Sequence, residues 1–164
     1  MSARILNSTL LPALTGLLLS TIALPVRADE AVTPPAPIAE PTRVLDRAGE
    51  QRLLANKGLT LQWLDWNTRG TAYVRRDGDT LRLRGAQAQA GGPGRLFLDG
   101  TISEVGAGYF TFDGTIEITD TPDKGRSCKK TKSWHFAVTQ NRDYYRLREF
   151  EWCDGLTDYI DIYF

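Results

Sequence analysis

The sequence is poor in the residues that most often carry catalysis or bind metals. Of its 164 residues only two are cysteine and one, His135, is histidine. The cysteines lack C-x-x-C spacing, and a structural zinc site normally needs four ligands. No G-x-S-x-G turn or other nucleophile motif accompanies the histidine, so it has no evident catalytic partner. These absences predict a protein that is not an enzyme and that holds no metal or cofactor.

The first 28 positions contain no acidic residue and no unbroken apolar run of the ~18–20 residues that cross a bilayer. Arg4 provides a positive start, an apolar stretch runs from Leu10 to Val26, and Ala28 is a small residue at the cleavage position. We therefore expect residues 1–28 to be a cleaved secretory signal peptide. The protein would then be exported, to the periplasm or to the outside of the cell.

The mature chain has little excess charge of either sign. Removing residues 1–28 takes away Arg4 and Arg27, so 18 of the 20 basic residues remain beside 20 acidic ones, a net charge of −2. Nucleic acids and anionic membranes both demand a basic surface. We therefore expect neither as the main partner. The interleaved charges of both signs are typical of a soluble surface.

Residues 29–43 and the segment after them differ sharply in composition. Proline lacks the backbone donor and fixes φ, so the proline-rich residues 29–43 are expected to form a disordered spacer rather than a helix or a central strand. Residues 44–57 then place apolar side chains at roughly helical spacing, and Gly58 is a plausible stop. This pattern predicts one short helix.

From Gly58 onward the apolar residues recur at every second position, which is the period of a β-strand. In residues 109–119, four apolar side chains between Phe110 and Ile118 share one face. Turn sequences such as Asp77-Gly78 separate the predicted strands from one another. The other strands are predicted at residues 59–66, 71–76, 80–85, 95–103, 134–140, 144–152 and 158–164.

Short strands that follow one another through tight turns indicate an antiparallel meander. About eight such strands suffice to close a small barrel. We therefore predict an all-β domain at residues 44–164, a meander of about eight strands that forms a small closed β-barrel, preceded by one short helix. An open sandwich is the main alternative architecture.

Cys128 and Cys153 are expected to form one disulfide, because an exported protein reaches an oxidising compartment. A turn centred near Arg142 would bring Cys153 opposite residue 131, within reach of Cys128. The bond is then expected to pin the charged loop 120–133 at the base of this hairpin.

The strand predicted at 144–152 carries the candidate ligand-binding residues. One of its faces presents Tyr144, Arg146, Arg148 and Trp152. If this face points into the barrel, the guanidinium groups would line a cavity for an anionic small molecule, because arginine matches carboxylate and phosphate geometry. If the face points outward, the arginines pair with neighbouring acids instead. Sequence parity alone does not choose between the two.

Two further functions compete with a small-ligand barrel. A protein-binding or inhibitor module would act through loops 86–94 and 120–133. A small outer-membrane β-barrel is the lesser alternative, because the chain ends on the aromatic Phe164 after alternating isoleucines. The acidic residues Asp154, Asp158 and Asp161 do not match calcium-loop spacing, so they are attributed to turns and solvent.

Overall fold

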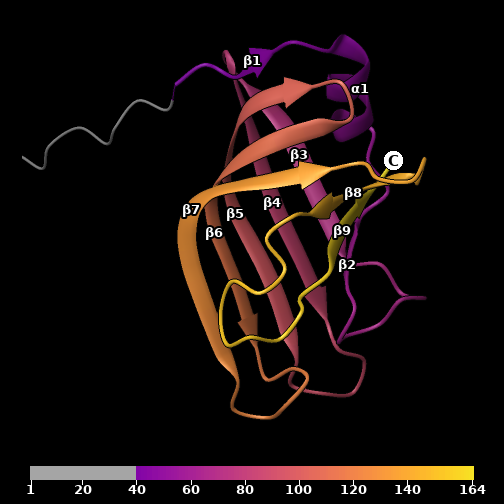
Figure 1. Cartoon of the computed structure of the whole chain (residues 1–164), viewed down its shortest axis with the longest axis vertical. Coiled ribbons are helices and arrows are strands. Elements are labelled where there is room, and N and C mark those ends of the chain that lie inside the picture. The colour runs from indigo at the N-terminus through magenta and orange to yellow at the C-terminus, as the bar shows by residue number, and fades with distance from the viewer. Residues whose placement is uncertain (1–39) are drawn as a thin grey trace, which may run out of the picture. The chain divides into compact units, whose positions relative to one another are not determined.

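The computed structural model describes residues 40–164, and the description of the fold concerns these residues (Figure 1). The predicted signal peptide and the first part of the predicted spacer lie outside them. The single helix is α1 (Arg47–Leu54). The strands are β1 (Arg43–Val44), β2 (Leu59–Leu61), β3 (Thr71–Asp77), β4 (Thr80–Ala88), β5 (Arg95–Gly106), β6 (Tyr109–Thr119), β7 (Ser127–Ala137), β8 (Tyr144–Leu147) and β9 (Ile160–Tyr163).

The strands form the predicted meander and a nearly closed eight-stranded barrel. Their order is β2-β9-β8-β7-β6-β5-β4-β3, so β3 to β9 follow chain order and every pair in this path is antiparallel. The short β1 lies outside this path and pairs in parallel with β5. Figure 1 shows the strands curving around a common interior, with α1 near one end.

Closure of the barrel depends on one backbone bridge between Leu59 and Gly70. The Leu59 N–H donates to Gly70 O at 3.1 Å, and the Gly70 N–H donates to Leu59 O at 2.8 Å. A Cβ on Gly70 would lie 2.1 Å from the carbonyl oxygen of Ala86, which is closer than any real contact. Only glycine therefore allows the first and last strands of the path to meet.

The barrel interior is filled by the alternating apolar side chains that defined the strands. Phe110, Phe112, Ile116 and Ile118 of β6 are all fully buried, as their period-two spacing predicts. The largest fully buried side chains are Trp134, Tyr145, Phe110, Phe112 and Phe136. The outward positions of the same strands carry most of the polar residues.

The helix is shorter than the predicted range 44–57, because Val44 belongs to β1 and Asp46 caps the helix from outside it. Arg43 and Val44 pair with β5, and the Asp46 carboxylate caps the helix by accepting hydrogen bonds from the N–H groups of Ala48 and Gly49. Leu53 packs into the core with no exposed surface. Residues 40–43 of the predicted spacer therefore lie against the barrel rather than extending away from it.

The largest difference from the predicted strands is at β7 and β8. β7 begins at Ser127, so half of the predicted loop 120–133 is strand, and β8 ends at Leu147 rather than at residue 152. Only Phe136 with Leu147 and Ala137 with Arg146 are paired between them. Residues 148–159, which we call the side panel, then run without regular structure to β9 (Figure 1).

Candidate functional site

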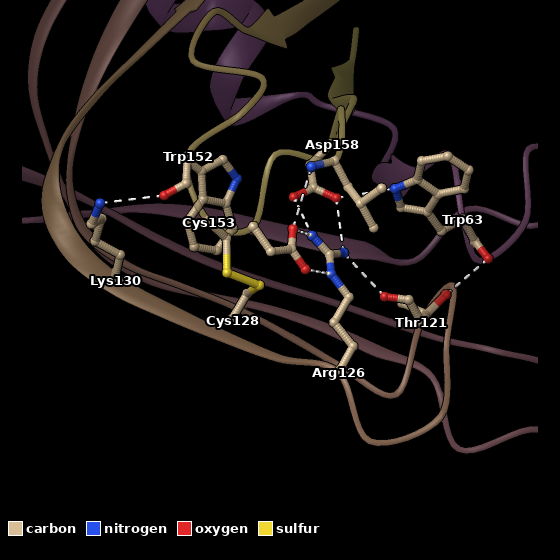
Figure 2. The surroundings of a disulfide bond; sticks show 10 residues. Trp63, Thr121, Arg126, Cys128, Lys130, Trp152, Cys153 and Asp158 are labelled. Carbon is tan, nitrogen blue, oxygen red and sulfur yellow. Dashed lines mark hydrogen bonds and ion pairs between the residues drawn. A yellow bond between two sulfur atoms is a disulfide. The ribbon is translucent and has the colours of Figure 1, made fainter.

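The predicted disulfide is present and joins β7 to the side panel. Cys128 is buried on β7 and Cys153 is exposed on the panel, with 5.9 Å between their Cα atoms. Figure 2 shows the bond beside Trp152 and below Asp158. Because residues 127–133 belong to β7, the disulfide holds the side panel against a strand and not a mobile loop.

A buried arginine next to the disulfide fastens the same panel. The Arg126 guanidinium donates to both carboxylate oxygens of Asp154, at 2.8 Å each, and to those of Asp158, at 3.0 and 2.9 Å. Its fifth hydrogen bond goes to Thr121 O at 3.0 Å, so every N–H of the group is used (Figure 2). Asp158 is fully buried and Arg126 is only 5% exposed. With no donor left, Arg126 has a structural role.

The network extends from the panel to the loop after β2. The Trp63 indole N–H donates to Asp158 at 3.0 Å, and the Thr121 hydroxyl donates to Trp63 O at 3.0 Å (Figure 2). On the other side of the disulfide, Lys130 donates to Trp152 O at 3.3 Å. The panel is therefore attached along its length although it is not a strand.

Acid is expected to weaken this attachment between about pH 4 and about pH 2. Hydrogen bonds from Arg126 hold the pKa of Asp154 at about 2, below the ordinary value of about 3.9 for aspartate. Because the pKa is lowered on folding, the ionised carboxylate stabilises the folded state above pH ~4, and this contribution is lost as the pH falls through the folded value. Urea unfolding followed by tryptophan fluorescence measures the effect.

The control for this prediction is Asp154→Asn, which removes the titrating group. Its unfolding free energy should fall less steeply with decreasing pH over the same interval. Identical pH profiles for the two proteins would contradict the assignment.

Trp152, a predicted ligand-binding residue, belongs to the core. Its side chain is 8% exposed and meets the ring of Trp134 edge-on, with 5.2 Å between the ring centroids. Alternation of faces holds only within a strand, and β8 ends five residues earlier. Trp152 therefore does not share a face with Arg146.

The other predicted residues of β8 lie on the outside of the barrel. Tyr145 and Leu147 have no exposed surface and point into the core. Tyr144 and Arg146 alternate with them and so face outward, and Arg148 is exposed at the start of the side panel. The guanidinium groups thus do not line the interior of the barrel.

Arg146 pairs with an acid, as an outward face requires. Its guanidinium donates to both oxygens of Asp161 on β9, at 2.7 Å each, and to the Tyr144 hydroxyl at 3.2 Å. The Tyr159 and Tyr144 rings flank it, with centroids 4.2 and 5.2 Å away. The Asp161 carboxylate raises the pKa of Arg146, so the group stays charged.

A surface depression of about 290 Å³ lies beside this pair. We call it the arginine depression, and its lining residues are Thr139, Gln140, Arg142, Arg146, Arg148, Phe150 and Tyr159. Arg142 donates to the Tyr144 hydroxyl at 2.7 Å, and Arg148 lies over the Phe150 ring at 5.0 Å. Within residues 40–164, neither Arg142 nor Arg148 makes an ion pair. Three guanidinium groups therefore face one carboxylate here.

Comparison with known proteins places the domain in a family. The profile of the PM1083 family matches residues 41–164. The chain belongs to the PM1083 family. It is similar to the uncharacterized protein PM1083 of Pasteurella multocida (strain Pm70), with 35% identity over 117 residues, which cover 70% of this chain and 75% of that protein. No solved structure matches the chain.

Other observations bear on the alternatives for this PM1083-family domain. Residues 86–88 belong to β4 and 127–133 to β7, so the predicted contact loops shrink to 89–94 and 120–126. Thr121 bonds to Trp63 on the loop after β2, and Gly94 lies against Leu64 of that same loop. Trp66, two residues further along, is 47% exposed. In the part of the chain that the structure describes, no helix is long and apolar enough to span a bilayer.

Sequence reasoning missed the acids that hold the arginines of this family member. The spacing of Asp158 and Asp161 predicts turns and solvent exposure, yet both are fully buried and paired. The sequence indicates Arg142 only as the centre of a turn. The one available signal was the alternation of Ile160, Asp161 and Ile162, which places an acid at a regular position in a hydrophobic strand.

Proposed function

We propose that this protein is an exported binding module that holds an anionic small molecule in the arginine depression. The observation that carries the proposal is the pair of guanidinium groups, Arg142 and Arg148, that flank Arg146 without a carboxylate of their own among the described residues. Arginine presents a planar fork of donors that matches carboxylate and phosphate groups.

The three arginines differ in how firmly they are held. Arg146 is fixed by two hydrogen bonds to Asp161 and by the rings on either side, so it supplies a rigid charged floor. The Asp161 carboxylate neutralises the positive charge of Arg146, one of the three. An excess of about two positive charges therefore remains on Arg142 and Arg148, which suits an acid group of one or two negative charges.

Aromatic side chains add an apolar wall to the depression. Phe150 and Tyr159 pack edge to face, with 5.1 Å between their centroids. The Tyr144 hydroxyl beside them accepts hydrogen bonds from both Arg142 and Arg146, which leaves its own O–H to donate. A ligand with an acid group and a ring or other apolar part uses both features.

The volume limits the size and the affinity of the ligand. At about 290 Å³ the depression is at the lower end of the range of known ligand sites, and it lies open on the outside of the barrel. Water competes with an anion at such a site. We therefore propose a small ligand, bound at micromolar to millimolar affinity rather than tightly.

Titration with phenyl phosphate tests the proposal, because this probe combines a phosphate with an aromatic ring. We expect it to shift the backbone amide NMR resonances of Arg142, Arg148 and Tyr159. The double substitution Arg142→Gln/Arg148→Gln should raise the dissociation constant by about tenfold or more, since it removes two charge-assisted contacts. Higher salt should weaken the binding in the same way.

Two control variants sharpen this titration. Arg47→Gln removes an arginine whose side chain is 80% exposed on α1, and it should leave the dissociation constant unchanged. Trp66→Ala removes the exposed indole on the loop after β2 and should also have no effect. Equal affinity of the double variant and the unchanged protein would refute the proposed site.

Export is part of the proposal and has its own support. A disulfide persists in oxidising compartments and is rare in the cytosol. The bond between Cys128 and Cys153 is compatible with the cleaved signal peptide that residues 1–28 predict.

A protein-binding module is the second candidate, and Trp66 is the observation that favours it. Tryptophan is enriched among the residues that dominate protein–protein contacts, and this one is 47% exposed on the loop after β2. In that case the partner would contact residues 89–94 and 120–126 as well. Loss of partner capture in Trp66→Ala, with phenyl phosphate binding unchanged, would separate the two functions.

A further inference from the structure

A second basic surface lies on β3 and β4, on strands that contribute nothing to the arginine depression. A depression of about 360 Å³ is lined there by Tyr73, Arg75, Asp77, Arg82 and Arg84. We call these residues the β3–β4 arginine face. All five side chains project outward from the barrel, because they alternate with the inward Val74, Leu81 and Leu83.

The strand register places two arginines of this face directly opposite each other. Arg75 on β3 pairs with Arg82 on β4, and Tyr73 pairs with Arg84. Like charges directly opposite on antiparallel strands destabilise a sheet. Because this arginine pair opposes folding, its presence needs an explanation other than stability. Binding of an anionic partner across both guanidinium groups is such an explanation.

Three arginines of this face stand against two carboxylates, those of Asp77 and Asp99, so an excess of one positive charge remains. Asp99 on β5 lies 3.2 Å from Arg84 and 3.8 Å from Arg82, so one carboxylate serves two arginines. Arg75 makes no ion pair within residues 40–164. The described domain as a whole is neutral, because Arg4, Arg27, Asp29 and Glu30 outside it remove two charges of each sign from the 20 of each in the chain. The positive charge on this face is therefore local.

The spacing of the charges suits a chain of repeating acid groups. Arg82 and Arg84 are two residues apart on one strand, about 7 Å, and Arg75 lies about 5 Å away across the strand pair. Tyr73 is 66% exposed next to them, and Phe97 on β5 is 40% exposed nearby in the same sheet. We propose that the β3–β4 arginine face binds an acidic polysaccharide, with the guanidinium groups on its carboxylates and the Tyr73 ring against a sugar.

The placement of the aromatic rings favours a polysaccharide over other polyanions. A sugar ring presents a flat face of C–H groups that packs on an aromatic ring, and Tyr73 offers such a ring, 66% exposed, on β3 at the end of the strand order. Membrane-surface binding uses an amphipathic element with an apolar side that enters the headgroup layer, whereas four of the five residues of this face are charged. Single-stranded nucleic acids are bound on several aromatic side chains that stack successive bases, whereas Tyr73 is the one aromatic residue among the five of this face.

Binding to polygalacturonate, a carboxylated polysaccharide, tests the inference. We expect the full-length mature protein to be retarded by it in affinity electrophoresis and not by neutral dextran. The substitution Arg75→Gln/Arg82→Gln should weaken this binding by about tenfold or more. The same variant should keep or raise its Tm, by roughly 1–4 °C, because the opposed charges are gone.

The matched control is Arg142→Gln/Arg148→Gln, which removes two arginines of the arginine depression and should leave polygalacturonate binding intact. This result would also make the two sites independent of each other. Unchanged polygalacturonate binding by Arg75→Gln/Arg82→Gln overturns the inference. Stronger retention by single-stranded DNA or by anionic phosphatidylglycerol vesicles than by polygalacturonate overturns it as well, in favour of those partners.

Discussion

Replacing Arg126 with methionine is expected to lower the free energy of unfolding by about 3–5 kcal/mol, the typical cost of breaking a buried ion pair from one side. The substitution removes five hydrogen bonds at once and leaves the fully buried Asp158 without a counter-ion. Asp154 on the side panel loses its partner at the same time. Urea unfolding near neutral pH measures the change through the midpoint concentration.

Two further variants show whether the buried pair causes this loss. Arg126→Met/Asp158→Asn removes both charges but keeps an acceptor for the Trp63 indole, so it should recover part of the lost stability. Lys124→Met removes an exposed side chain that makes no ion pair within residues 40–164, and it should change the free energy of unfolding by about 0.5 kcal/mol at most. If Arg126→Met costs no more than Lys124→Met, the network does not hold the panel.

Removing the disulfide with Cys128→Ala/Cys153→Ala is expected to cost about 3.5 kcal/mol. The bond joins residues 25 positions apart, and closing a loop of that length restricts the unfolded chain by about this amount in the chain-entropy model. Thermal and urea unfolding measure the loss. Amide hydrogen exchange should become faster in residues 148–159 than in β5 and β6, since the bond anchors only the panel to β7.

The same variant links stability to the proposed site. Arg148, Phe150 and Tyr159 lie on the side panel, whereas Arg146 lies on β8. Releasing the panel should therefore weaken phenyl phosphate binding even at temperatures where the barrel stays folded. Exposure of the unchanged protein to a thiol reductant should give both effects. Uniform exchange across the domain, with intact binding, would show that the panel does not depend on the disulfide.

The Arg126 network and the disulfide both anchor the side panel, the irregular segment that completes the barrel after the end of β8. Over most of its length β7 has no strand on the side away from β6, and the panel fills that place. It contributes Trp152 to the core, against Trp134, and turns Arg148 to the outside. Anchoring the panel therefore serves both the hydrophobic core and the arginine depression.

Most of the barrel follows from local patterns in the sequence. The strands β3 to β6 and the disulfide lie close to where alternation, turn residues and cysteine count predict them, because period two and one buried face are properties of each strand alone. The pattern failed at residues 148–152. There Phe150 and Trp152 continue the apolar alternation in the sequence, but strand pairing with β7 ends at Leu147. The disulfide and Arg126 then hold the segment beside β7 without a strand ladder.

The sequence by itself indicates a small all-β domain with a single disulfide, and the structure contains both. The sequence also indicates an export signal, which stays a prediction. Only the tertiary structure decided which way the arginines face. Tyr145 and Leu147 could take the interior because an aromatic ring and an aliphatic chain are uncharged and largely hydrophobic, and their burial turned Arg146 outward. It also decided which acids neutralise them, since Asp158 and Asp161 lie 32 and 15 residues from the arginines that they bind. Such ion pairs depend on which strands and segments become neighbours in the folded barrel, and the local spacing of residues does not predict those neighbours.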